Sequence, residues 1–570
     1  MRATFSSVLL VAVLGGAAAL SLFGSGCGSD GVASQFDAGD DATTDALGDG
    51  GFPDDVIGIN ESGPLGPFPD FPATPIIDAP DGGVAAPGNA PTLFGAPTQG
   101  AQTGGPCLIE PEIGSLYPNN WLRPRFKWIA AGGENLFELR LHVANQINDL
   151  VVYTASTDWT MPKTMWDALR RHSADVDMTL SVRGGVLAGT MLTGEALGST
   201  GAIGIAPVDA PGTIVYWTTS GGSSLKGFSV GDETVGAVLV PTQVQEKSTT
   251  CIGCHTSTPD GKYVGFSTID NSWANAIASI EMGTVGAAPP FLGAGGKAAI
   301  ERPEIGIGSF SKAHWAAGDR VEIVQHDPGG GAVLEWIDLE AANAATASGV
   351  IARNGDARLA GAPTWSHDGN TIVYVSTNHV CTGRLGDCVG GPGDNGAVSD
   401  LYSVPYNNRA GGASAAIPGA SDPSFAEYYP VFSPDDRLLA FNRIANDLLV
   451  YNAPTAEVFV VPSAGGAATR IVANDPPACS GKTSPGVTNS WPKWAPSVAE
   501  SKGRTYYWVV FSSTRSPAGN PQLYVSPVVV DAMGKVRTYH ALYLWNQPAG
   551  ENNHTPAWDF FKIPPPPPPK

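Results

Sequence analysis

The sequence predicts an all-β protein, and three observations lead to that class. Glycine (71 residues) and proline (48 residues) are abundant in the 570-residue chain, whereas only 15% of the residues are charged. This composition favours short strands and turns over long helices. From about residue 107 onward, segments alternate apolar and polar residues with the period of two that half-buried strands require. A turn rich in serine and aspartate, followed by an apolar strand, then repeats through the second half of the chain.

Residues 1–27 predict an export signal. MRATFSSVLLVAVLGGAAALSLFGSGC has one basic residue, an apolar run near residues 8–23 and a small-residue stretch that ends at Cys27. It resembles a bacterial lipoprotein signal, although Gly24 stands where that family usually has leucine, so cleavage by ordinary signal peptidase is the alternative. The resemblance implies an outer-membrane lipoprotein of the bacterial cell envelope, facing the periplasm or the cell surface. Membrane contact is then expected only through a lipid at Cys27.

Residues 28–106 predict a disordered acidic linker. This stretch is dominated by Gly, Ala, Pro, Asp and Thr, and no Lys or Arg occurs between Arg2 and Arg123. Such a composition buries too little apolar surface to offset the entropy lost on ordering. Much of the net charge of −21 lies here, and the overall acidity argues against nucleic acid as a partner. At the other end, residues 563–570 predict a stiff polyproline tail.

Residues 107–206 predict a β-sandwich. Strand-like segments such as RPRFKWIA, LFELRLHVAN and DMTLSVRGG are separated by Gly, Asn, Asp and Pro. The pattern resembles a fibronectin type III or immunoglobulin-like domain, in which TMWDALRRHS would be an excursion between strands. The resemblance implies a spacer or a docking surface.

Residues 212–562 predict a β-propeller. The segments STPDGKYVGFST (257–268), APTWSHDGNTIVYVST (362–377) and YPVFSPDDRLLAFNR (429–443) each place a Ser/Asp turn before an apolar strand. They resemble the repeat of TolB-type, WD40-like propellers, which has an aromatic residue before the turn. Corresponding positions lie 50 to 67 residues apart and suggest six blades: Ser257, Trp315, Trp365, Phe432, Trp494 and Trp558.

The last of these positions has almost no chain behind it. Trp558 is followed by only a few residues before the prolines. Residues 212–242, in contrast, contain strand-like sequence but none of the six corresponding positions of the repeat. We therefore expect the propeller to close by exchange, with residues 556–560 forming the innermost strand of a blade whose outer strands come from residues 212–242. Closure of this kind removes the free edges of an open ring.

The segment CIGCH, residues 251–255, predicts one covalent haem c. Cys251 and Cys254 have the spacing that joins the two vinyl groups of haem, and His255 would be an axial ligand of the iron. A redox dithiol or a zinc site would need a context that the chain lacks. His255 occupies the slot that proline fills in the other repeats, so the haem is expected near one mouth of the central channel.

A second axial ligand would come from elsewhere in the chain. His554 lies four residues before Trp558, in the blade that strand exchange puts next to the haem blade, and is the first candidate. His314, beside Trp315, is a less favoured alternative. Met282, another residue or an open position remains possible, and the choice decides between electron transfer and turnover of a small molecule.

The remaining cysteines predict disulfides, because an exported protein meets an oxidising compartment. The segment CTGRLGDC brackets a glycine-bearing loop and favours a local Cys381–Cys388 bridge. A Cys107–Cys479 bridge then follows by elimination.

Three functions are compatible with these features. The leading hypothesis is a cell-envelope c-type cytochrome that exchanges electrons with a redox partner. The alternatives are a haem-dependent redox enzyme at the propeller channel, and a non-enzymatic scaffold that binds another envelope protein and holds a structural haem. No nucleophile elbow, zinc-protease helix or phosphate-binding loop is present in the sequence, and whether the protein is an enzyme stays open.

Overall fold

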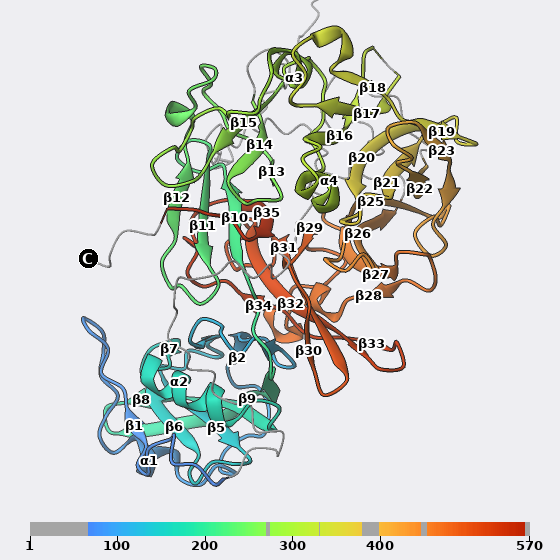
Figure 1. Cartoon of the computed structure of the whole chain (residues 1–570). Helices are drawn as coiled ribbons and strands as arrows, with labels where there is room; N and C mark the ends of the chain where they lie inside the picture. The colour runs from blue at the N-terminus through green and yellow to red at the C-terminus, as the bar shows by residue number, and fades with distance from the viewer. Residues whose placement is uncertain (1–65, 269–273, 330, 379–397, 446–452, 565–570) are drawn as a thin grey trace, which may run out of the picture.

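The computed structural model describes residues 66–268, 274–329, 331–378, 398–445 and 453–564. Within these ranges the chain is all-β, with only four short α-helices. An N-terminal unit lies at the bottom of Figure 1, beneath a larger series of sheets that begins near residue 213. The predicted signal, the lipid site Cys27, the tail beyond residue 564, and both Cys381 and Cys388 lie outside the described residues.

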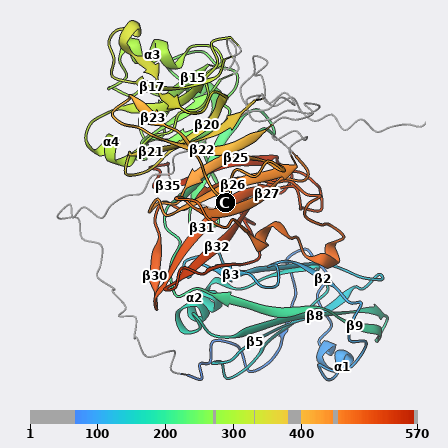
Figure 2. The same ribbon diagram turned by 90° about the vertical axis from the view of Figure 1, so that its right-hand side faces the viewer.

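The N-terminal unit contains two sheets. The larger has the strand order β1-β6-β5-β8-β9-β3 and the smaller β2-β4-β7. Figure 2 shows the two sheets stacked, with α2 (Lys163–His172) at one edge. The strands are β1 (Ile76–Ile77), β2 (Cys107–Glu110), β3 (Leu116–Tyr117), β4 (Arg125–Ile129), β5 (Leu136–Val143), β6 (Leu150–Thr154), β7 (Asp158–Thr160), β8 (Met178–Ala188) and β9 (Met191–Ile205).

The predicted linker is ordered from residue 66 onward, which corrects its expected end at residue 106. Strand β1 pairs in parallel with β6, and the short helix α1 (Ala90–Phe94) inserts a fully buried Phe94 against Tyr153. Phe71 is 2% exposed. A few aromatic side chains docked onto an existing sheet are enough to order a polar segment, because the sheet supplies the apolar surface that the segment lacks.

The rest of the chain forms successive sheets in a propeller-like arrangement, antiparallel except for the pairs β19–β23 and β22–β25. Five strands, here called first strands, contact one another in turn: β13 contacts β35, β35 contacts β29, β29 contacts β25 and β25 contacts β20. Strand β20 also contacts β16. The early strands are β10 (Thr213–Thr218), β11 (Ser224–Ser229), β12 (Gly236–Leu239), β13 (His255–Ser257), β14 (Tyr263–Ser267), β15 (Asn275–Ser279), β16 (Val321–His326), β17 (Val333–Asp338), β18 (Ser348–Val350) and β19 (Ala352–Asn354). The middle strands are β20 (Leu359–Trp365), β21 (Thr371–Thr377), β22 (Ser399–Pro405), β23 (Gly411–Ala413), β24 (Ala415–Ala416), β25 (Phe425–Phe432), β26 (Leu438–Ala445), β27 (Glu457–Pro462) and β28 (Thr469–Arg470). The late strands are β29 (Asn489–Trp494), β30 (Ala499–Ser501), β31 (Arg504–Ser513), β32 (Gln522–Asp531), β33 (Val536–Thr538), β34 (Leu542–Tyr543) and β35 (Asn553–Asp559).

The repeated Ser/Asp turn has the same hydrogen bonds in each of its three clear copies. In the first, the Thr258 hydroxyl donates to Asp260, which also accepts from the backbone of Lys262 (2.6 and 3.1 Å). In the second, Ser366 donates to Asp368 (2.6 Å). In the third, Ser433 donates to Asp435 (2.7 Å). The hydroxyl and the carboxylate replace the backbone partners that a tight turn leaves unpaired, which is why these residue types recur.

Four of the first strands share a bulge at their proline. The residue before proline has a positive φ in β20, β25, β29 and β35, and each strand shifts its register there: Ala362 (φ 49°), Tyr429 (φ 52°), Trp491 (φ 54°) and Thr555 (φ 44°). Proline has no N–H to donate to the ladder, so the strand bulges where proline occurs. Strand β13 has His255 in that slot and pairs with β14 without a register shift.

One of the predicted aromatic marks is not in a strand. Trp315 lies in α4 (Lys312–Ala316), not before a strand turn. The first strand of its sheet is reduced to isolated bridges, Ile305 to His326 and Ser309 to Ile323. Helix α3 (Ala294–Ile300) precedes them. The position of an aromatic residue does not identify a strand here, because a helix can bury an indole in the core as well as a strand can.

The C-terminal strand completes the sheet formed by residues 213–239. Strand β35 pairs antiparallel with β10, and the sheet order is β12-β11-β10-β35. Trp558, in this strand, is 1% exposed and its indole N–H donates to the Pro211 carbonyl (2.7 Å). The C-terminal strand therefore pairs with the strand that begins this series of sheets, as the strand pattern predicts.

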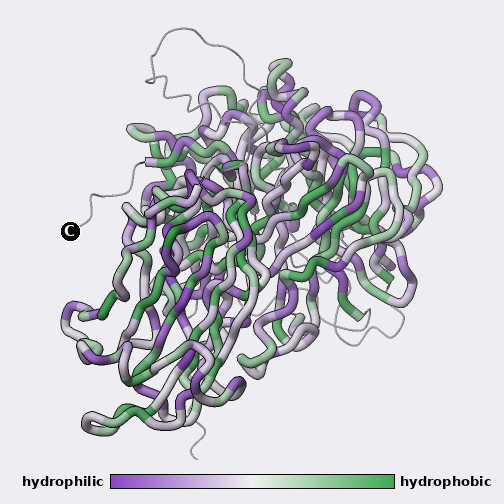
Figure 3. The backbone as a smooth tube through the Cα atoms, turned by 90° about the horizontal axis from the view of Figure 1, so that it is seen from below, coloured by the Kyte–Doolittle hydropathy of each residue, from purple (hydrophilic) through white to green (hydrophobic). Residues whose placement is uncertain are grey.

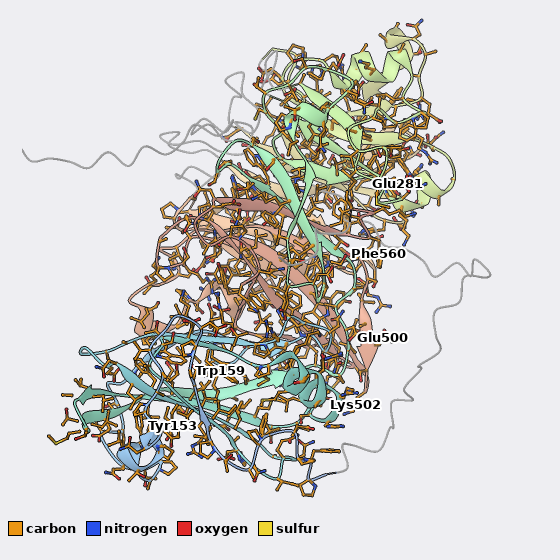
Figure 4. All side chains as sticks on the ribbon, turned by 90° about the vertical axis from the view of Figure 1, so that its left-hand side faces the viewer. Tyr153, Trp159, Glu281, Glu500, Lys502 and Phe560 are labelled. Carbon is orange, nitrogen blue, oxygen red and sulfur yellow. A yellow bond between two sulfur atoms is a disulfide. The ribbon has the colours of Figure 1, made fainter. Side chains whose placement is uncertain are left out.

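The N-terminal unit and the sheets share one apolar core. Trp121 of the N-terminal unit lies 6.4 Å from Trp558, ring centre to ring centre, and the same cluster includes Tyr216 and Trp508. Figure 3 shows hydrophobic stretches of the backbone interspersed with hydrophilic ones throughout the molecule. At the surface, Lys502 in the turn between β30 and β31 lies next to the N-terminal unit (Figure 4) and pairs with Asp175 (3.0 Å). The N-terminal unit is thus packed against the sheets and not held away as a spacer.

A disulfide joins the two parts as well. Cys107, at the start of β2, is bonded to Cys479, 372 residues further along the chain. This is the pair that elimination predicts from the sequence.

We expect removal of residues 550–570 to destabilise the whole protein. The deletion exposes the edge of β10 and removes Trp558, and loss of one buried tryptophan alone costs about 3–5 kcal/mol. Thermal melting followed by circular dichroism checks this. Removal of residues 565–570 alone is the control, and equal melting of both truncated chains would contradict the role given to β35.

Candidate functional site

The Cys-x-x-Cys-His segment leads directly into β13. The Gly253 N–H donates to the Ser267 carbonyl (2.8 Å), and the Ser267 N–H donates to the Cys254 carbonyl (3.0 Å). His255 then stands opposite Phe266 in the ladder. The segment therefore extends the edge of β14 and brings its histidine to the first strand of the sheet.

Both cysteines of the motif are buried. Cys251 is 1% exposed and Cys254 is 2% exposed, and Cys254 belongs to an apolar cluster that includes Val264 and Phe266. Cys251 is disulfide-bonded. The Thr249 side chain holds the backbone at this point, because its hydroxyl donates to the Cys251 carbonyl (2.7 Å).

His255 is a buried neutral imidazole. It is 3% exposed, and neither ring nitrogen has a hydrogen-bond partner of normal geometry among the described residues. Burial lowers its pKa from 6.5 to about 3, and the charge of Lys493 in β29 acts in the same direction. The nearby carbonyl of Val215 offsets part of this effect. An imidazole of this kind keeps its lone pair at neutral pH.

His554 has a similar environment on β35. It is 5% exposed and lies between Trp217 and Trp491, with ring centres 4.5 and 5.5 Å away. Its Nδ1 makes no hydrogen bond among the residues that the structure describes. Burial lowers its pKa to about 3.

The fold brings these two histidines to neighbouring strands. Strands β13 and β35 are in contact, and the Ser257 hydroxyl donates to the Asp559 carboxylate between them. Both imidazoles border the same stretch of β10: the Val215 carbonyl influences His255, and Trp217 packs on His554. The predicted neighbourhood of the two blades is therefore present in the structure.

His314 has a different role. It lies in α4, stacks on Trp365 (4.6 Å between ring centres) and contacts Asp319 through Nδ1 (2.8 Å). These contacts use the ring and one nitrogen to hold α4 against the neighbouring sheet. Met282, the other alternative, is 69% exposed.

Sequence reasoning missed Lys493, Trp217 and Trp491 as neighbours of the histidines. Trp491 and Lys493 flank Pro492 of β29, and this proline corresponds to His255 of β13. That correspondence was the signal that could have identified both residues. Nothing in the local sequence of Trp217 indicates its contact with His554, since that contact depends on the pairing of β10 with β35.

The donor types at the motif fit haem c. Covalent attachment needs two sulfur atoms, and axial ligation needs an imidazole nitrogen without an ordinary hydrogen bond, as His255 has among the described residues. The Cys251 disulfide has to be reduced before its sulfur can bond a vinyl carbon. Because the motif is 3% exposed or less, neighbouring side chains also have to move to admit the macrocycle. Within the described ranges no group of three or more His, Cys, Asp or Glu side chains is arranged to hold a metal ion.

The chain was compared with known families, proteins and structures. No family model and no curated protein sequence matches it. Among solved structures it is similar to TolB from Acinetobacter baumannii (TM-score 0.35, 13% identity, covering 68% of this chain and 79% of that one). It is also similar to hydrazine synthase of Kuenenia stuttgartiensis (TM-score 0.28, 15% identity, covering 51% and 70%). A third is an N-acetylgalactosamine deacetylase from F. plautii (TM-score 0.28, 11% identity, covering 51% and 83%). At such TM-scores these likenesses carry no inference about activity.

We expect the two buried histidines to make the protein acid-sensitive. Between pH 6.5 and 3 the unfolded chain binds protons at both imidazoles and the folded chain does not, so stability falls as the pH falls through this window. Each histidine contributes about 1.4 kcal/mol per pH unit. The free energy of unfolding can be measured with urea at a series of pH values. Its slope against pH should be smaller by this amount in His255→Gln and in His554→Gln than in the parent.

The matched control for this measurement is His142→Gln. The His142 side chain is 61% exposed and pairs with Asp149 (2.8 Å), so its replacement removes no buried imidazole and should not reproduce the change expected of the two buried histidines. Comparison with the parent cancels the opposing effect of buried acids such as Glu322, whose pKa burial raises to about 8. Unchanged slopes in both buried-histidine variants would contradict their neutral, buried state.

Proposed function

We propose that the protein is a cell-envelope c-type cytochrome that carries one covalent haem on a propeller and transfers electrons to a redox partner. The observation that carries the proposal is the Cys-x-x-Cys-His motif. Its buried histidine makes no ordinary hydrogen bond within the described ranges and lies on a strand next to that of a second buried histidine. Bound haem would supply one-electron chemistry at its iron.

Each residue of the motif would have a separate task. Cys251 and Cys254 would anchor the group through thioethers, and His255 would bind the iron through a ring nitrogen. His554, with its unbonded Nδ1 and its aromatic neighbours, would be the second ligand. Burial favours these roles, because it keeps both imidazoles neutral and excludes water from the site.

The finer architecture belongs to the same proposal. We infer a six-bladed TolB-type propeller that β35 closes, and a fibronectin type III or immunoglobulin-like sandwich packed on its side. The strand orders and the shared bulges support the first inference, and the stacked N-terminal sheets support the second. In the envelope, the lipid at Cys27 would hold the protein at the outer membrane. None of the described helices has the length and apolar character to cross a membrane.

A second candidate is a non-enzymatic scaffold that binds an envelope protein. The observation in its favour is the Cys251 disulfide, which gives this cysteine a structural use without haem. The third alternative, a haem-dependent redox enzyme, would require an open iron position.

The test is to express residues 28–570 in a host with haem c maturation machinery and to record reduced and oxidised spectra with and without carbon monoxide. We expect a covalent, low-spin haem that does not bind carbon monoxide in the parent. His554→Ala should convert the iron to a high-spin form that binds it, because one axial position opens. Cys254→Ser should weaken covalent attachment.

His142→Ala is the matched control and should leave the spectra unchanged, because this histidine is exposed in the N-terminal unit. A parent protein that binds carbon monoxide would favour the enzyme. A folded protein without covalent haem would contradict the cytochrome and leave the scaffold.

A further inference from the structure

A cavity of about 420 Å³ lies where the N-terminal unit meets the sheets. One wall comes from β2 and β4, through Glu110 and Lys127. The opposite wall comes from the segments around Pro477 and Pro517 and from Tyr524 of β32. Its volume is in the range of sites that hold small organic molecules, and it is independent of the haem motif.

The two walls are held together before any ligand binds. The Cys107–Cys479 disulfide joins β2 to the segment that includes Pro477. Glu112 and Arg515 form an ion pair across the boundary (2.8 Å), and both side chains are 3% exposed or less. A cavity with fixed walls binds without paying the entropy of ordering them.

The acidic groups of the cavity are already neutralised by arginine. Arg125 binds Glu110 through two nitrogens, the shortest contact being 2.7 Å. Arg515 binds Glu112. Burial raises the pKa of Glu110 to about 7, which reduces its negative charge further. These pairs leave no surplus of negative charge on the wall.

Two lysines on the lining have no carboxylate partner in the described part of the chain. Lys127 is half-buried and makes no ion pair there, although Asp158 is its cross-strand neighbour. The Lys482 ammonium donates to the carbonyls of Thr514 and Ser516. An ammonium has three donors, so one remains for a ligand. The cavity is therefore net positive in a protein whose formal charge is −21.

The remaining surface is aromatic and apolar. The rings of Tyr524 and Tyr543 lie 5.3 Å apart, centre to centre, and the Arg515 guanidinium lies 4.9 Å from the Tyr524 ring centre. Pro476, Pro477 and Pro517 complete the lining on the side of the sheets. Flat rigid groups of this type pack against flat apolar molecules.

We propose that this cavity binds a small organic anion with a flat apolar body. Its acid group contacts Lys127 and Lys482, and its body lies against the tyrosines and prolines. A cation is disfavoured because the glutamates are already paired, and a bare inorganic anion would leave the apolar wall uncovered.

The probe for this proposal is anilinonaphthalene sulfonate, with uncharged anilinonaphthalene as its matched counterpart, titrated by fluorescence against the folded parent protein. Lys127→Gln and Lys482→Gln should each weaken sulfonate binding about ten-fold, as expected for loss of one charge-assisted contact, and leave the uncharged probe unaffected. Ala518→Trp places a large side chain on the lining and should weaken both probes.

Lys535→Gln is the control, because Lys535 is exposed and is not part of the lining. Circular dichroism melting identifies any variant that is unfolded. No sulfonate binding by the parent, or equal binding by parent and both cavity lysine variants, would overturn the proposal and leave a water-filled gap. Weakening by Lys535→Gln to the same extent would also overturn it, because the probe would then respond to overall charge.

Discussion

The pairing of β35 with β10 is the interaction on which the rest of the structure depends. It brings the last strand of the chain beside a strand that begins more than 330 residues earlier. It also places Trp558 against Trp121 in the core shared with the N-terminal unit. The same strand carries His554 to Trp217 and Asp559 to Ser257. Because this single pairing satisfies the facing edges of β10 and β35, it stabilises the sheet, the packing of the N-terminal unit and the histidine neighbourhood together.

The first strands show how one local rule produces a repeated geometry and how one departure from it creates a distinct site. Proline cannot donate to a ladder, and four strands accommodate it with a positive φ at the preceding residue. In β13 the slot holds His255, which stands opposite Phe266 in a ladder without a register shift. The strand thus runs without a bulge and buries an imidazole instead. The position that differs from the repeat is the histidine of the proposed haem motif.

The boundary between the two parts combines strong packing with a cavity. Aromatic side chains from both parts form one core, and the disulfide and the Glu112–Arg515 pair join the two walls beside the cavity. A buried ion pair of this kind is strongly destabilising to break, because either partner alone would be an uncompensated buried charge. The geometry of the cavity is therefore coupled to the docking of the N-terminal unit.

The sequence by itself determined the local features of this protein. Period-two alternation identified β5, the Ser/Asp turns marked three strand pairs, and unassigned strand-like sequence at 212–242 indicated exchange with the C-terminus. These features depend on backbone chemistry and on alternation, which act over a few residues. Covalent haem, its second ligand and the lipid anchor stay predictions.

Only the tertiary structure decided the features that depend on distant contacts. It ordered residues 66–106, whose few apolar side chains are buried only against a sheet whose strands lie elsewhere in the chain. It showed that Trp315 lies in a helix and not before the turn of a strand repeat, because an indole can be buried from either kind of element. It also assembled the cavity from Lys127 and Lys482, which are 355 residues apart in sequence. No local pattern records such neighbours, since the free energy that brings them together comes from burial across the whole interface.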